Sequence, residues 1–140
     1  MLKLVIDTNV VISALLKQES NPALIMSLIL RGICTLCLTE KIFVEYEEVS
    51  GRGKFKKLDQ ASVREFLSAL RRRALWVVPE VPVDGITEDP DDNVFLECAL
   101  ESKADFLITG NIHHFPGKKF HHTSIVTPNE FVSHTVKLIK

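Results

Sequence analysis

The chain has few of the features that mark membrane proteins, disulfide-bonded scaffolds or low-complexity segments. No stretch approaches the ~18 uninterrupted apolar residues of a membrane span, so we expect no membrane association. The three cysteines are few and odd in number, which argues against a disulfide framework and favours a reducing compartment. No repeat or linker is visible, and the N-terminus lacks a signal-peptide pattern. We therefore expect a cytoplasmic protein.

The charge balance is nearly even and leaves the class of partner open. There are 17 basic and 18 acidic residues, for a formal net charge of −1, and local patches rather than totals set the field at a surface. Hydrophobic residues make up 46% of the chain, enough for a packed core. The length of 140 residues suits one domain, since domains are most often ~100–150 residues long. We predict a single domain over residues 1–140.

Two of the cysteines form a C-x-x-C, at Cys34 and Cys37. The pair lies within Ile33–Leu38, which reads as a strand, whereas a redox C-x-x-C belongs at the start of a helix. A zinc site would need a second pair of ligands. Free cysteines are commonly buried, so we predict that these thiols and Cys98 are structural.

Strand and helix patterns alternate along the chain, which predicts an α/β fold with helices on both faces of a parallel sheet. The strands are predicted at Leu2–Ile6, Ile33–Leu38, Trp76–Pro79, Asp105–Thr109 and His121–Val126. The helices are predicted at Asn9–Leu16, at Asn21–Leu30, at Glu40–Val49 after a Thr39 cap, from an Asp59 cap to Arg73, from Asp92 or Asn93 through Leu100, and from Pro128-Asn129 onward.

Acidic residues stand where such a sheet binds ligands. Asp7 directly follows the first strand, and open α/β sheets bind ligands beyond the carboxyl ends of their strands. Asp92 precedes a predicted helix, and Glu45 lies inside the helix after the second strand. Carboxylates ~4 Å apart repel by about 4 kcal/mol at an effective dielectric near 20, so a shared pocket needs protons or a cation. Oxygen ligands favour Mg²⁺ or Mn²⁺, and one or two such ions support phosphodiester hydrolysis.

Each acid also has a simpler explanation. Asp7 at a strand end suits a turn cap, and a helical Glu such as Glu45 usually faces solvent. At least one acid of Asp89–Asp92 suits an N-cap. The joint arrangement, rather than any one residue, favours a site.

Four segments follow one another in an order that is more specific than any of them alone. They are Val5-Ile6-Asp7-Thr8-Asn9-Val10, Glu45-Tyr46-Glu47-Glu48-Val49, Asp89-Pro90-Asp91-Asp92-Asn93 before Phe95-Leu96-Glu97, and Ala104-Asp105-Phe106-Leu107-Ile108-Thr109-Gly110-Asn111. Together they resemble the PIN-domain nucleases, in particular the branch related to VapC ribonucleases, over nearly the whole chain.

The resemblance implies a three-layer α/β/α Rossmann-like domain that binds Mg²⁺ or Mn²⁺ and hydrolyses RNA. It also implies the toxin of a toxin–antitoxin pair, which forms a homodimer and is inhibited by a small antitoxin. The implied catalytic acids and metal ligands are Asp7, Glu45 and Asp92, with Asp89 and Asn111 as further metal ligands and Thr8, Asn9 and Thr109 as supporting residues.

The chain departs from the family pattern at the fourth acid. Many relatives have Asp at the position of Asn111 or at that of His114, and this chain has neither. Asn111 can still coordinate through its amide oxygen, but one negative charge fewer weakens a second metal site. Two functions remain open: a metal-dependent endoribonuclease, or a catalytically weak or inactive RNA-binding PIN domain.

A basic segment, Gly51–Lys57, follows the helix that carries Glu45. Its positive charges suit phosphates and its one aromatic residue suits a base. The alternative is a solvated charged loop. Lys118, Lys119 and the pairs His113-His114 and His121-His122 form a second candidate patch. The predicted RNA contacts are Arg52, Lys54, Lys56 and Lys57.

Overall fold

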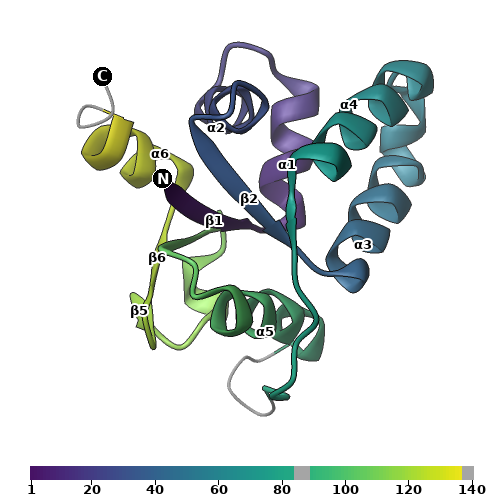
Figure 1. Ribbon diagram of the computed structural model, residues 1–140. Helices are drawn as coiled ribbons and strands as arrows, with labels where there is room; N and C mark the ends of the chain where they lie inside the picture. The colour runs from purple at the N-terminus through teal and green to yellow at the C-terminus, as the bar shows by residue number, and fades with distance from the viewer. Residues whose placement is uncertain (84–88, 137–140) are drawn as a thin grey trace.

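The computed structural model describes residues 1–83 and 89–136, in which strands and helices alternate (Figure 1). No helix in these ranges is both long and apolar enough to span a bilayer. The elements are β1 (Leu2–Ile6), α1 (Thr8–Leu16), α2 (Asn21–Leu30), β2 (Cys34–Leu38), α3 (Glu40–Ser50), the 3₁₀ turn η1 (Gly53–Lys57), α4 (Gln60–Arg73), β3 (Leu75–Trp76), η2 (Pro90–Asp92), α5 (Asn93–Ser102), β4 (Phe106–Ile108), η3 (Ile112–His114), β5 (Lys119–Phe120), β6 (Thr123–Val126), α6 (Pro128–Phe131) and the π-helical turn η4 (Val132–Val136).

The described strands form one sheet in the order β3-β2-β1-β4-β6-β5. The central strand β1 pairs in parallel with β2 and β4, and the parallel pairing continues to β3 and β6. Helix α5 packs on one face, against β1, β2 and β4, while α2 and α4 pack against β2 from the other face (Figure 1). These layers confirm the predicted α/β/α arrangement.

The sheet differs from the prediction at its two edges. Strand β3 is shorter than the predicted Trp76–Pro79 and starts one residue earlier, and Pro79 has no N–H with which to extend the pairing. At the other edge, β5 runs antiparallel to β6, so the sheet is mixed rather than wholly parallel. The two are joined through His121-His122, and His121 has φ 52°. Gly or Asn normally marks such a turn. This turn has neither, so the sequence did not indicate the hairpin.

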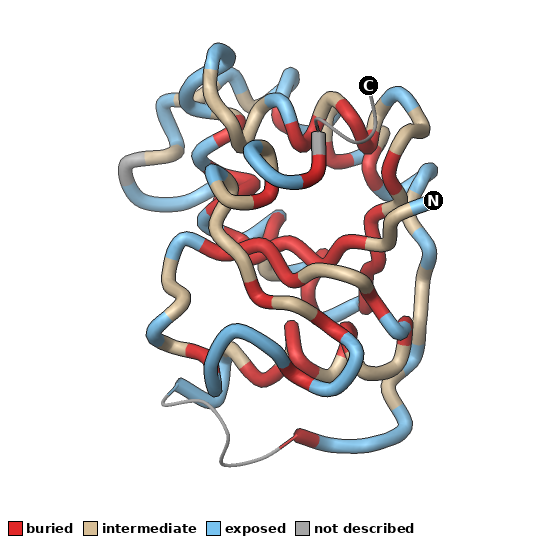
Figure 2. The backbone as a smooth tube through the Cα atoms, turned by 90° about the vertical axis from the view of Figure 1, so that its left-hand side faces the viewer, coloured by how far each residue is buried: buried red, intermediate tan, exposed pale blue. Residues whose placement is uncertain are grey.

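The core surrounds the central strand. Leu4, Val5 and Ile6 are each 0% exposed, as expected for a parallel strand that is covered on both faces. Figure 2 shows the buried backbone gathered in the interior, with exposed segments on the outside. The rigid centre of the sheet therefore supports the strand end at which Asp7 lies.

The cysteines are buried and free, which confirms the prediction that they are structural thiols. Burial raises the pKa of all three thiols. A buried thiol with a raised pKa is a poor nucleophile and a poor metal ligand. The C-x-x-C therefore contributes packing to β2.

The starts of two helices confirm predicted caps, and two others do not use the cap that their position offers. Thr39 and Asp59 each accept a hydrogen bond of 3.2 Å from a main-chain N–H of the following helix. Asp7 and Asp92 occupy the N-cap positions of α1 and α5, but in the described structure neither carboxylate makes a cap hydrogen bond. The main-chain N–H groups of Thr8 and Asn9 nevertheless lower the pKa of Asp7, so the start of α1 still favours its negative charge.

Candidate metal centre

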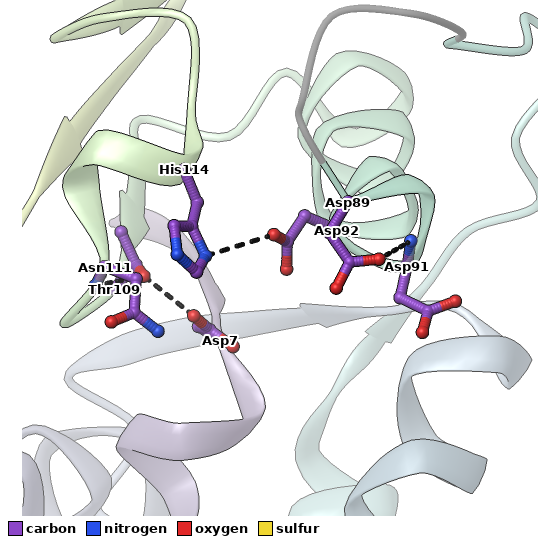
Figure 3. A network of polar contacts seen from close by, with 7 residues as sticks. All are labelled: Asp7, Asp89, Asp91, Asp92, Thr109, Asn111 and His114. Atoms are coloured by element: carbon purple, nitrogen blue, oxygen red, sulfur yellow. Dashed lines mark hydrogen bonds and ion pairs between the residues drawn. The ribbon is translucent and has the colours of Figure 1, made fainter.

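Asp7 lies at the carboxyl end of β1, where the chain turns into α1. Its side chain is buried, and its Oδ2 accepts a hydrogen bond of 2.7 Å from Thr109 Oγ1. Thr109 follows the neighbouring strand β4, and its hydroxyl also accepts the N–H of Asn111 at 3.0 Å. Two adjacent strand ends therefore bring Asp7, Thr109 and Asn111 together (Figure 3).

Glu45 reaches the same region from α3. Its Oε2 accepts a hydrogen bond from Thr8 Oγ1, on the residue after Asp7. The next residue on the helix, Tyr46, is fully buried, and its hydroxyl donates to the carbonyl of Ile6 at 2.5 Å. These contacts hold α3 beside the end of β1 and place the Glu45 carboxylate near Asp7.

Asp92 approaches from the start of α5. Its side chain is 16% exposed, and its Oδ2 lies 3.5 Å from Nδ1 of His114. Among the described residues this buried oxygen has no hydrogen-bond partner. Asp89 accepts the N–H of Asp91 at 3.0 Å and so closes the turn before α5. Figure 3 shows the Asp92 carboxylate directed toward His114, whereas Asp89 and Asp91 are exposed.

The three acids come from separate elements and affect one another's ionisation. Burial raises the pKa of Asp7. Burial also raises the pKa of Glu45 and that of Asp92, and the negative charge of Asp7 raises both further. Groups that disfavour one another's charge in this way gain from a nearby cation.

The acids do not already form a complete set of ligands. Within residues 1–83 and 89–136, no three His, Cys, Asp or Glu side chains lie close enough together to hold one ion. Coordination by all three acids would need at least one of them to rotate, and their role as joint ligands stays a prediction. Each acid has its own neighbour: Thr109 for Asp7, Thr8 for Glu45 and His114 for Asp92.

The predicted basic segment lies next to this acidic region. Arg52 is exposed at the end of α3, and its positive charge lowers the pKa of Glu45, against the stronger effect of burial. Lys56 and Lys57 are exposed in η1, and the side chain of Lys54 lies outside the described residues. Asn9, predicted as a supporting residue, is exposed on the first turn of α1.

His114 was predicted in a second basic patch and not as a residue of the acidic site, yet its side chain faces Asp92. It is carried by η3, where its N–H bonds the carbonyl of Asn111 at 2.9 Å. The imidazole of His114 lowers the pKa of both Asp7 and Asp92. The sequence offered a signal for this role, because His114 stands at one of the two positions where the resemblance led us to expect a fourth acid.

Comparison with known proteins agrees with this geometry. The sequence pattern of the PIN domain matches residues 3–113. An uncharacterised protein of Methanocaldococcus jannaschii is 30% identical over 148 residues, covering 99% of this chain and 94% of the relative. A chain of VapBC2 from Rickettsia felis, solved with a DNA fragment from their promoter, superimposes with a TM-score of 0.59 at 13% identity. That match covers 90% of this chain and 98% of the other. The chain therefore belongs to the PIN-domain family, whose members are generally nucleases that use divalent metal ions.

Proposed function

We propose that this protein is a metal-dependent endoribonuclease and the toxin of a toxin–antitoxin pair. The observation that carries the proposal is the mutual effect of Asp7, Glu45 and Asp92: burial raises the pKa of each, and the charge of Asp7 raises the pKa of the other two. Asp7 lies at the carboxyl end of β1, the edge at which α/β sheets bind their ligands. Carboxylates whose negative charge is disfavoured would be stabilised by a cation, and basic residues beside them would attract a phosphodiester.

The residues present fit a hard divalent cation. All of the predicted acidic ligands are oxygen donors, which Mg²⁺ and Mn²⁺ prefer. Asp92 Oδ2 is buried, and it accepts no hydrogen bond from the described part of the chain. Asp7, Glu45 and Asp92 would hold the ion, with Asp89 and the amide oxygen of Asn111 as further donors. When bound, the ion stabilises charge on the phosphodiester and activates the attacking water.

The protein's own groups orient the acids and attract the substrate. The hydroxyl of Thr109 fixes the Asp7 carboxylate, and that of Thr8 fixes Glu45. In the metal-free protein each of these acids is therefore held by one neighbouring hydroxyl. The basic segment provides phosphate contacts at Arg52, Lys54, Lys56 and Lys57.

The toxin assignment draws on the structural relative. That chain comes from a VapBC2 complex with a promoter DNA fragment, which supports an antitoxin as the partner of this protein. We propose a homodimer that is inhibited by a small antitoxin covering the acidic region. Co-expression with the product of an adjacent open reading frame, followed by co-purification, would test the pairing.

The alternative function is RNA binding without cleavage. Asn111 and His114 stand where many relatives have the fourth acid, and the described acids do not already surround one ion. A protein of this kind would use the basic segment and would not turn over RNA. Cleavage is therefore the property that separates the two proposals.

The test is cleavage of labelled single-stranded RNA with Mn²⁺, with Mg²⁺ and with EDTA. We expect cleavage with metal ions, none in EDTA, and a loss in Asp7→Asn larger than the roughly 10–100-fold typical of changes around a metal site. Asp59→Asn is the matched control, because Asp59 is an exposed N-cap and Asn caps equally well. Equal RNA binding by wild type and Asp7→Asn, with no cleavage by either, would favour the alternative.

A further inference from the structure

His114 lies over the acidic region at the position of the missing fourth acid. Figure 3 shows its ring between Asp92 and the Asp7–Thr109 pair. The imidazole lowers the pKa of both Asp7 and Asp92, so it lies in the same polar cluster as these acids. The side chain is 38% exposed, which leaves it room to adjust. An imidazole therefore occupies a place where the family pattern has a carboxylate.

The separation between His114 and Asp92 is informative. Nδ1 and Oδ2 are 3.5 Å apart, which is longer than the ~2.7–3.2 Å of an N–H···O hydrogen bond. Two neighbouring ligands of one ion, each ~2.0–2.2 Å from it at angles between ~90° and ~110°, are separated by roughly 3.0–3.5 Å. The pair thus has the spacing of two ligands, and Asp92 Oδ2 has no hydrogen-bond donor in the described ranges.

A second His–Asp pair shows that distance alone is not sufficient. His122 Nε2 lies 3.6 Å from Asp105 Oδ1, but the His122 side chain is 67% exposed. Asp105 already accepts the N–H of Lys3 through Oδ2 at 2.8 Å, and it precedes β4, at the opposite end of that strand from Thr109. The His114–Asp92 pair differs because it is shared with Asp7 at the carboxyl ends of the strands.

We propose that His114 supplies an imidazole nitrogen to the ion held by Asp7 and Asp92, and that this ligand makes the site favour Mn²⁺ over Mg²⁺. The inference rests on the proposed metal site and adds a residue to it. Mg²⁺ takes oxygen ligands almost exclusively, whereas affinity for mixed nitrogen and oxygen sites rises along the first-row transition ions from Mn²⁺ onward. Since the described side chains form no ready three-ligand group, Asp7 completes the set by rotating from Thr109.

Pulsed electron paramagnetic resonance of the Mn²⁺-loaded protein tests this directly. We expect a ¹⁴N coupling typical of a coordinated imidazole in wild type, and its loss in His114→Gln. The Mn²⁺ affinity measured by titration should fall about tenfold or more in that variant, with a smaller change for Mg²⁺. His122→Gln is the matched control, because it removes an imidazole from a comparable pair and should keep the coupling.

The outcomes separate the inference from the function on which it rests. Bound Mn²⁺ with a spectrum free of nitrogen coupling in wild type would overturn the role of His114 and leave the metal site standing. An unchanged coupling in His114→Gln would do the same. Failure of wild type to bind Mn²⁺ at millimolar concentration would overturn both. His114→Asp gives a further check, because a restored acid should raise Mg²⁺ affinity relative to Mn²⁺.

Discussion

Replacing Asp7 with Asn should make the metal-free protein more stable, although the residue is proposed to be essential for activity. Asp7 is 5% exposed, and its charge is disfavoured by burial, as its raised pKa shows. Asn has nearly the same shape, and its amide oxygen can still accept the hydrogen bond from Thr109. The substitution therefore removes a stressed charge and keeps the local packing.

The size of this stabilisation depends on the charge that Asn removes and on the hydrogen bond to Thr109 that Asn keeps. Relief of unfavourable charge typically stabilises a protein by about 0.5–2 kcal/mol, which corresponds to a rise in Tm of roughly 2–8 °C for a domain of this size. Asp7→Ala gives the contrast, because it also removes the acceptor for the fully buried Thr109 hydroxyl. Leaving a buried polar group without its partner costs about 1–3 kcal/mol, so this variant should be less stable than Asp7→Asn.

The gain in stability of Asp7→Asn over wild type should depend on pH and on whether a metal ion is bound. The folded state holds the Asp7 proton more tightly than the unfolded state, so wild-type stability falls as pH rises from the ordinary value of 3.8 through the raised pKa. The stabilisation by Asn is thus fully present above the raised pKa and shrinks as pH falls toward 3.8. With Mn²⁺ at 100 times Kd, wild type gains about 2.7 kcal/mol and the order reverses.

The assay is urea unfolding of wild type, Asp7→Asn and Asp7→Ala in EDTA, at neutral and acidic pH, with a repeat in Mn²⁺. Lower stability of Asp7→Asn than of wild type in EDTA at neutral pH would refute the reasoning, because the Asp7 charge would then stabilise the fold. An advantage that does not change between neutral and acidic pH would refute its electrostatic origin.

Three further outcomes test other parts of the structure. Thr109→Val should cost about 1–3 kcal/mol in urea unfolding, because it removes the side-chain hydroxyl that donates to the buried Asp7 carboxylate, and Thr109→Ser should recover most of the loss. Thr127→Ala should cost about 1 kcal/mol, because Thr127 and Glu130 form a reciprocal capping box. Hydrogen bonding to the Thr127 backbone lowers the pKa of Glu130. The capping box should therefore stabilise the fold fully above the ordinary pKa of Glu, and this stabilisation should fade as pH falls, which Tm measured across acidic pH would show. The cysteines, being buried, should react with a thiol reagent only after unfolding; rapid labelling of the folded protein would contradict their structural role.

The main elements could be predicted because their signals are local. The start of α3 was predicted from Thr39 and that of α4 from Asp59, and both caps are present. The apolar run Leu2–Ile6 gave the bounds of β1. The hairpin of β5 and β6 could not be predicted in this way, because its turn carries neither Gly nor Asn, and nothing local in the sequence indicates the positive φ of His121.

The sequence could nominate candidate site residues, which stay a prediction, but not the contacts that these residues make. Asp7, Glu45 and Asp92 were nominated from their positions along the predicted strands and helices, and the family resemblance supported them. How near they lie to one another depends on how β1, α3 and α5 pack, which no local signal encodes. His114 shows the limit more clearly. In the sequence it is one of two adjacent histidines, and only the turn η3, closed by the His114 N–H to Asn111 bond, directs it toward Asp92.

The hydrogen bonds that hold Asp7 and Glu45 bear on whether the protein needs a metal ion in order to fold. In the described part of the chain no three His, Cys, Asp or Glu side chains already surround one point, so in the metal-free protein these two acids are held by their neighbouring hydroxyls rather than by one another's ligand geometry. A hydrogen bond to a charged group contributes about 1.5–3 kcal/mol, and two carboxylates ~4 Å apart repel by about 4 kcal/mol at an effective dielectric near 20. These energies are of the same order, so Thr8 and Thr109 let the metal-free fold tolerate its acids without an ion. The metal should therefore adjust the stability of this protein rather than determine whether it folds, in contrast to small zinc domains that unfold without their ion.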